Sequence, residues 1–187
     1  APAPGPVYGP DNAIWNNANA DRANFDSFGP RTVLLGSDIT TAFIQHNWWG
    51  SPFDFDLQGN TLTFSNTTGN AVSYNADDGT FTNGTIAFAA GVQVKAGNTI
   101  NEAGITVSFN CDIDGSSNTL TKVNHGTLSL GGSNNVYGTT TVLAGTLLVQ
   151  PGSSLGTDDV TLGDQNLQSS TWYGTLHLQT PDAIADD

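Results

Sequence analysis

The chain has few residues of several types, and each scarcity narrows the folds and functions open to it. It contains no Met and a single Cys among 187 residues. Because Cys111 has no partner in the chain, no internal disulfide stabilises the fold. A small buried thiol is the favoured interpretation, and an intermolecular crosslink is the alternative. A chain without Met lacks an initiator, and the opening Ala-Pro-Ala-Pro is typical of an exported protein after signal-peptide removal. We therefore expect a secreted or cell-surface protein.

Positive charge is also scarce. Four Lys and Arg residues oppose 17 Asp and Glu residues, which gives a net charge of −13 at pH 7. Such a surface repels phosphate backbones and anionic lipids, so we expect no binding to nucleic acid or to anionic membranes. No apolar run approaches the roughly 20 residues that a membrane-spanning helix needs. The chain is therefore not expected to be membrane-spanning.

A short repeat is the strongest structural pattern in the chain. The unit Gly-Thr-Leu begins at Gly126, Gly145 and Gly174, and alternating apolar and polar residues follow each copy. Alternation at period two indicates a half-buried strand. A return after about twenty residues is typical of stacked repeats and favours a parallel β-helix over a β-sandwich. Turn residues such as Asn83-Gly84 and Asp114-Gly115 separate the other strand-like segments.

These patterns predict an all-β protein, a right-handed parallel β-helix (β-solenoid) with an aromatic-rich N-terminal cap. Residues 1–13 contain much of the Pro and are expected to be extended. Residues 14–58 are rich in Phe and Trp and are expected to cap the solenoid, since its end needs an atypical repeat. Residues 59–187 are then expected to form the β-helix repeats.

Residues 120–148 resemble the autotransporter-associated β-strand repeat. The resemblance depends on Leu120-Thr121-Lys122, on two Gly-Thr-Leu units, and on Asn135-Val136-Tyr137-Gly138-Thr139-Thr140-Thr141-Val142 between them. Upstream segments such as 14–17 and 59–64 resemble the section that often precedes these repeats. The resemblance implies a right-handed parallel β-helix exported to the bacterial surface or beyond. Tyr137 and Gly138 depart from the family turn, which usually carries two glycines.

Few residues suggest a specific site, and none suggests catalysis. Trp48 and Trp49, with Phe53 and Phe55, form an aromatic cluster that could stack on a glycan or anchor another subunit, but plugging the open end of the solenoid is the favoured interpretation. Asp112 and Asp114 resemble the start of a calcium loop, but Val123 stands where the loop needs a bidentate Glu. Calcium is the one cofactor that we consider.

We therefore expect a non-enzymatic extracellular structural protein, the β-solenoid subunit of a bacterial surface layer or a self-assembling filament. End-to-end self-association is expected because solenoid ends present unpaired strand edges. The alternative is a secreted adhesin or glycan-binding module that contacts a glycan or host-surface ligand through the aromatic cluster. A polysaccharide-degrading enzyme is the third possibility, and four dispersed basic residues favour it least.

Overall fold

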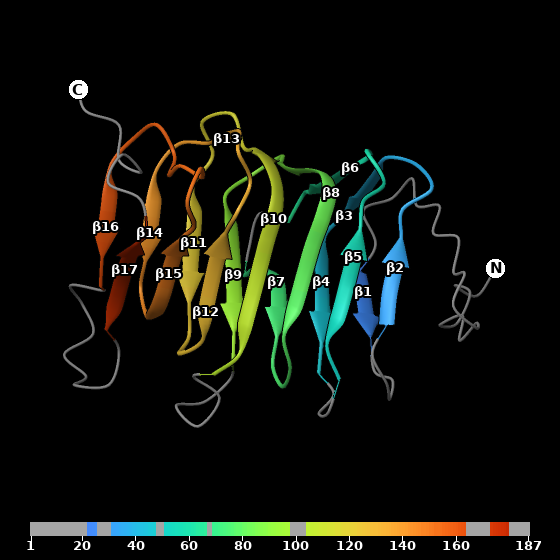
Figure 1. Ribbon diagram of the computed structural model, residues 1–187, viewed down its shortest axis with the longest axis horizontal. Helices are drawn as coiled ribbons and strands as arrows, with labels where there is room; N and C mark the ends of the chain where they lie inside the picture. Colours follow the sequence, from blue (N-terminus) through green and yellow to red (C-terminus); the bar gives the residue numbers. More distant parts are fainter. Residues whose placement is uncertain are drawn as a thin grey trace.

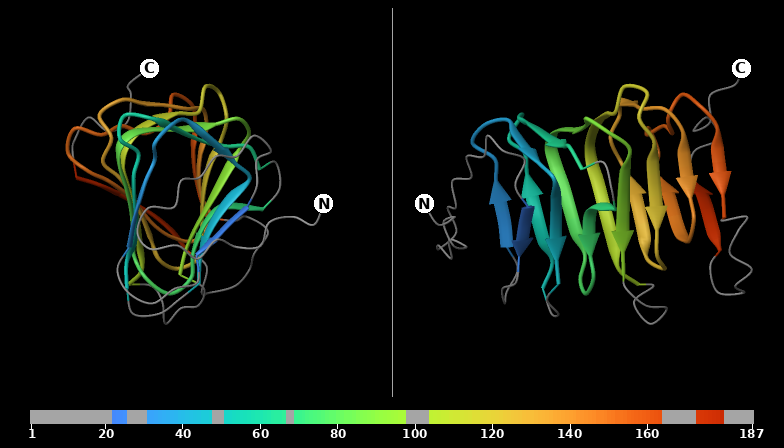
Figure 2. Two further views of the ribbon diagram at one scale, coloured as in Figure 1. Left: turned by 90° about the vertical axis from the view of Figure 1, so that its right-hand side faces the viewer. Right: turned by 180° about the vertical axis from the view of Figure 1, so that it is seen from behind.

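In the computed structural model, parallel strands stack in two sheets around one core, and the second sheet turns a corner onto a third face (Figure 1). The structure describes residues 22–25, 31–47, 51–66, 69–97, 104–163 and 173–179. Viewed along the stack, the strands and turns outline a closed ring (Figure 2). Every strand pair recorded in these residues is parallel, so the prediction of a parallel β-helix is confirmed. No helix that could cross a membrane occurs in the described ranges.

The first sheet, called sheet A here, contains seven strands in the spatial order β1-β4-β7-β9-β11-β14-β16. Their bounds are β1 Arg22–Phe25, β4 Phe43–His46, β7 Asn70–Tyr74, β9 Val92–Ala96, β11 Leu120–Val123, β14 Thr140–Val142 and β16 Val160–Leu162. At about 4.8 Å per strand, six steps make a stack about 29 Å long.

Sheet B has the spatial order β2-β5-β8-β10-β12-β15-β17. Its strands are β2 Arg31–Leu34, β5 Phe53–Asp56, β8 Gly79–Phe88, β10 Thr106–Asp114, β12 Thr127–Leu130, β15 Gly145–Val149 and β17 Gly174–Leu178. The third face consists of β3 (Ile39–Thr41), β6 (Thr61–Phe64), the second halves of β8 and β10, and β13 (Asn135–Val136).

The Gly-Thr-Leu units lie directly over one another in sheet B. Leu128 pairs with Leu147, and Leu147 pairs with Leu176. More residues separate Gly145 from Gly174 than separate Gly126 from Gly145. The pairing register is nevertheless the same, because the extra residues lie between β16 and β17. The repeat therefore marks a fixed position on successive turns of the solenoid, although the turns differ in length.

Inward-facing side chains form continuous columns through the core. In sheet B, Phe55, Phe81 and Phe109 occupy one column, and all three are fully buried. The Phe55 and Phe81 rings are stacked with centroids 4.8 Å apart, while Phe81 and Phe109 meet edge to face at 5.3 Å. Leu130 and Val149 continue the column in the following turns. Alternation along these strands thus gives sheet B an apolar inner surface.

The solenoid begins earlier in the sequence than we predicted. β1 and β4 pair in sheet A, and β2 and β5 pair in sheet B, in the same parallel manner as the later strands. β5 then pairs directly with β8, so no boundary in the fold exists near residue 58. Phe25, Phe53 and Phe55 pack toward the core in regular turns of the solenoid, whereas Phe43 lies on the outer face of β4. Residues 1–13, predicted to be extended, lie outside the described residues.

One predicted turn, Asn83-Gly84, is a corner within a long strand. Asn83, with a φ of +58°, and Gly84 lie inside β8, where the chain passes from sheet B to the third face. In β10 the equivalent corner is a register irregularity between Asn110 and Asp112. The turn that we expected at Asp114-Gly115 follows directly where β10 ends. Hydrogen bonds to adjacent turns of the solenoid hold both corners within continuous strands, which local turn propensity does not reveal.

Candidate functional site

The predicted aromatic cluster is buried as far as the structure describes it. Phe53 and Phe55 are 3% and 0% exposed, and Phe53 packs on Phe25 with ring centroids 4.3 Å apart. The order Phe-Asp-Phe-Asp in β5 explains this, because alternate residues of a strand face the same side. The prediction that these two rings contact a glycan or subunit is therefore wrong. Trp48 and Trp49 lie outside the described residues.

Asp112 and Asp114 lie two residues apart on the outer side of β10, beside a shallow hollow that Thr85, Asn134 and Val136 also line. The Asn134 N–H donates to Asp112 Oδ1 at 3.1 Å, and the Ser116 N–H donates to Asp114 Oδ1 at 3.3 Å. Within the described ranges, no group of three or more His, Cys, Asp or Glu side chains is placed to hold a metal. Calcium binding at these two residues stays a prediction from the sequence.

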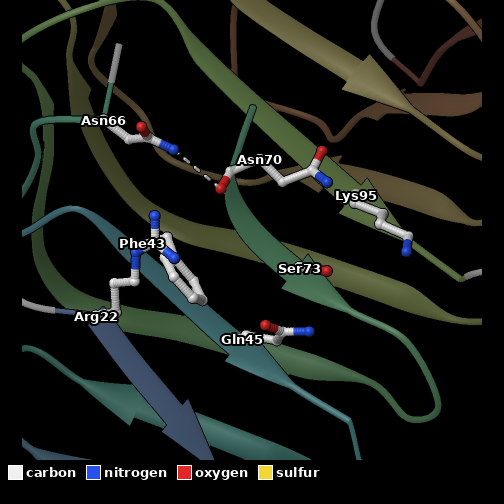
Figure 3. A pocket seen from close by; sticks show the side chains of 7 residues that line it. All are labelled: Arg22, Phe43, Gln45, Asn66, Asn70, Ser73 and Lys95. Atoms are coloured by element: carbon white, nitrogen blue, oxygen red, sulfur yellow. Dashed lines mark hydrogen bonds between the residues drawn. The ribbon is translucent and has the colours of Figure 1, made fainter. Parts of the chain in front are cut away.

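A polar groove on the outer face of sheet A was not predicted. It has a volume of about 250 Å³ and crosses β1, β4, β7 and β9 (Figure 3). Its lining combines two cationic side chains, one aromatic ring and four amide or hydroxyl groups: Arg22, Phe43, Gln45, Asn66, Asn70, Ser73 and Lys95.

Strand register brings these residues together from distant parts of the sequence. Gln45, Ser73 and Lys95 occupy one outward column on three successive strands, and Arg22 lies next to Phe43 in the neighbouring column. A register irregularity between Asn70 and Val72 interrupts the second column. There Ala71 is fully buried, so β7 offers only small or short side chains to the outer face. The groove is hollow because of this bulge.

The groove is a cationic site on an acidic protein. Two of the four basic residues of the chain line it, and no carboxylate does. The Arg22 guanidinium carbon lies 5.0 Å from the centre of the Phe43 ring, a cation–π contact that fixes its position. The scarcity of basic residues was visible in the sequence, but the convergence of Arg22 and Lys95 depended on the register of four strands.

Lys122 lies inside the core, in the inward column of sheet A between Val94 and Val142. It is 1% exposed, and its Nζ donates to the carbonyl oxygens of Val123 at 2.7 Å, Asn124 at 2.6 Å and Ala144 at 3.2 Å. Burial lowers the pKa of the ammonium to about 7, while the three carbonyls favour the charged form. Lys122 thus joins its own turn of the solenoid to Ala144 of the next.

Cys111 lies at the corner of β10 and is buried, as expected. Burial raises the pKa of its thiol to about 12; Asp112 adds to the increase, and a hydrogen bond with the Ile86 backbone opposes it. Because the thiolate is the nucleophile, a thiol with this pKa reacts slowly at neutral pH. The geometry supports the buried interpretation over the intermolecular crosslink.

We expect Cys111 to resist modification in the folded protein. At pH 8 a thiol-specific disulfide reagent should label the native chain at least about 100-fold more slowly than the urea-unfolded chain, since the folded thiolate fraction is far smaller. The measurement is absorbance of the released chromophore over time, and the single Cys makes the signal unambiguous. Equal rates in both states would contradict this prediction and favour the crosslink.

Comparisons of the chain with protein-family models, with curated proteins and with solved structures found no match. The resemblance to the autotransporter-associated repeat therefore stays a prediction from residues 120–148. The geometry nevertheless gives a physical reason for the motif. Lys122 and Gly145, which belong to its first and last elements, meet at one corner of the solenoid.

Proposed function

We propose that this chain is a non-catalytic structural protein of the bacterial cell exterior, a solenoid subunit that stacks end to end in a filament or surface layer. Its outer strand positions carry mainly Thr, Ser, Asn and Asp, which suits a surface exposed to water on all sides. The groove on sheet A includes no carboxylate among its lining residues. Glycoside hydrolysis ordinarily needs two, so this groove gives no support to a hydrolase.

The observation that carries the proposal is the exposure of core positions at one end of the stack. Val142 and Leu162 occupy the same inward column of sheet A, and Val142 is fully buried whereas Leu162 is 50% exposed. In sheet B, Leu147 is fully buried, while Leu176 above it is only partly buried. Among the described residues, β16 and β17 are also the last strands of their sheets. Another turn of parallel strands would bury these side chains and pair these edges.

At the opposite end of the described stack, β1 and β2 would supply the complementary edge. A contact between the β16–β17 end of one copy and the β1–β2 end of another repeats in one direction without closing, which produces a filament. The adhesin alternative depended on the aromatic cluster. Phe53 and Phe55 no longer support it, and the Trp pair supports it from the sequence alone.

The proposal predicts concentration-dependent rods. Electron microscopy and sedimentation velocity of the purified chain should show particles that lengthen with concentration, because each added copy buries the end of the previous one. Leu162→Asp should abolish this growth by placing a charge in the contact. Val136→Asp is the matched control: Val136 is 44% exposed but lies on the third face, away from the ends, so growth should persist.

Two results would overturn the proposal. One is a wild-type chain that stays monomeric across the whole concentration range. The other is assembly that both Asp variants reduce equally, since the contact would then not involve the β16–β17 end. Circular dichroism of each variant confirms that a loss of assembly does not reflect unfolding.

A further inference from the structure

We propose that the groove over β1, β4, β7 and β9 is a binding site for a short acidic oligosaccharide, one or two sugar units carrying uronate carboxylates. The site includes Arg22 of the end strand β1, but it lies on the outer face of sheet A and not on the strand edge that would stack, so this inference does not depend on filament assembly.

The distribution of positive charge indicates an anionic ligand. Of the four basic residues, Lys122 is buried in the core, and Arg22 and Lys95 are two of the remaining three. A chain with a net charge of −13 that collects cations in one groove creates a local attraction for anions. Arg22 presents a planar fork suited to a carboxylate, and Phe43 holds that fork in place before a ligand arrives.

The remaining lining groups suit sugar hydroxyls. The Gln45 amide donates to Asn47 Oδ1 at 2.7 Å, and the Ser73 hydroxyl donates to Asn75 Oδ1 at 3.3 Å, so both side chains are already oriented. Their oxygens can accept hydrogen bonds from hydroxyl groups. The Asn66 amide, which donates to the Asn70 carbonyl oxygen at 3.4 Å, defines the far wall (Figure 3). Side-chain amides and hydroxyls held in place cost little entropy on binding.

The dimensions limit the ligand to a short one. A volume of about 250 Å³ is smaller than the roughly 300–1,000 Å³ of pockets for drug-sized molecules. Arg22 and Lys95 lie at opposite ends of the groove, on strands three steps apart, or about 14 Å at the backbone (Figure 3). Each can therefore hold a carboxylate on a different sugar unit. A long polyanion would extend beyond the groove and meet the net negative charge of the protein.

The test is a titration of the full chain with digalacturonate, followed by calorimetry and by the NMR signals of side-chain amides. We expect saturable binding that shifts the amide signals of Gln45, Asn66 and Asn70. The methyl ester of the same disaccharide keeps the rings but loses the charges, and it should bind at least about 10-fold more weakly. Acetate, an anion without a sugar, should not reproduce the shifts.

Variants then assign the site. Arg22→Gln and Lys95→Gln should each weaken digalacturonate binding about 10-fold, and Lys95→Arg should retain most of it. Arg31→Gln removes the same charge from sheet B and should leave the affinity unchanged, with melting curves to confirm that each variant is folded. The proposal is overturned if digalacturonate does not bind saturably, if its methyl ester or acetate binds as well, or if Arg31→Gln weakens binding as much as the groove variants.

Discussion

Replacing Gly145 with Ala should destabilise the solenoid by about 2–5 kcal/mol, which is a large part of the stability of a typical domain. Gly145 opens β15 with a φ of +73°, a conformation that costs other residues about 1–2 kcal/mol. A Cβ atom there would also lie closer than 3.0 Å to the carbonyl oxygens of Asn124 and Gly126 and to the Nζ of Lys122. Relief of such overpacking typically costs a further ~1–3 kcal/mol.

The crowding around Gly145 cannot relax easily, because two of the three neighbours are backbone atoms of the preceding turn. The Thr146 N–H donates to the Gly126 carbonyl at 3.1 Å, so the spacing of the two turns is fixed by the hydrogen bonds between their backbones. A methyl group can be accommodated only by separating the turns and weakening these bonds.

Gly152 provides a matched control for this prediction. It also has a positive φ, +81°, but no atom lies within 4 Å of the position of its Cβ. Gly152→Ala should therefore cost only the conformational strain, about 1–2 kcal/mol. Urea unfolding of both variants isolates the contribution of close packing, and equal midpoints for the two would refute the proposed close approach of the turns.

Replacing Lys122 with Met should destabilise the protein by about 2–4 kcal/mol at pH 7, even though Met has a similar length and is apolar. The change leaves the carbonyl oxygens of Val123, Asn124 and Ala144 without the donor that they share. A buried polar group that loses its partner costs about 1–3 kcal/mol. Removing the buried charge offsets part of this loss of stability. The ammonium is desolvated, and no carboxylate is among the contacts recorded for it.

Lys122 should also make stability rise with pH. Its pKa is about 7 in the folded protein and 10.5 as the ordinary value, so between these pH values the unfolded chain binds more protons than the folded chain. The free energy of unfolding then increases with pH, by at most ~1.4 kcal/mol per unit. Between pH 7 and 9 the gain is up to about 2 kcal/mol, because at pH 7 half of the folded lysine is still protonated.

The measurement is urea unfolding of the wild type and of Lys122→Met at several pH values from 7 to 9. Above pH 9 the unfolded Cys111 thiol ionises while the folded thiol, with a pKa of about 12, does not, and this lowers stability. Within the window the wild type should gain stability and the Met variant should not. Parallel profiles would mean that the three carbonyls offset burial and keep the pKa of Lys122 near its ordinary value.

The glycine and the lysine also show why the repeat has its particular residues. Gly145 permits two turns to approach at a corner, and Lys122 satisfies the carbonyls that the corner turns inward. Both residues belong to the motif found in the sequence, but the sequence did not show that they are in contact. The sequence spacing showed that the unit recurs, whereas the reason for each residue type came from the packing of one turn on the next.

Local patterns in the sequence determined the fold class. The alternation of Leu128 with Leu130 and of Leu147 with Val149 indicates which side of a strand is buried. The recurrence of Gly-Thr-Leu indicates stacking, since a repeated unit buries its apolar side against its neighbours. The charge balance predicted, from the sequence alone, that nucleic acid and anionic membranes are not partners. These inferences needed no knowledge of which distant residues meet.

The tertiary structure alone decided that β1, β2, β4 and β5 already belong to the solenoid, that Phe53 and Phe55 face inward, and that Lys122 lies in the core. It also brought Arg22, Phe43, Ser73 and Lys95 to one groove. The physical reason is register. Successive turns of this solenoid differ in length, and one bulge at Ala71 changes which side chains face outward. Hydrogen bonds between turns set that alignment, and a linear sequence does not contain them.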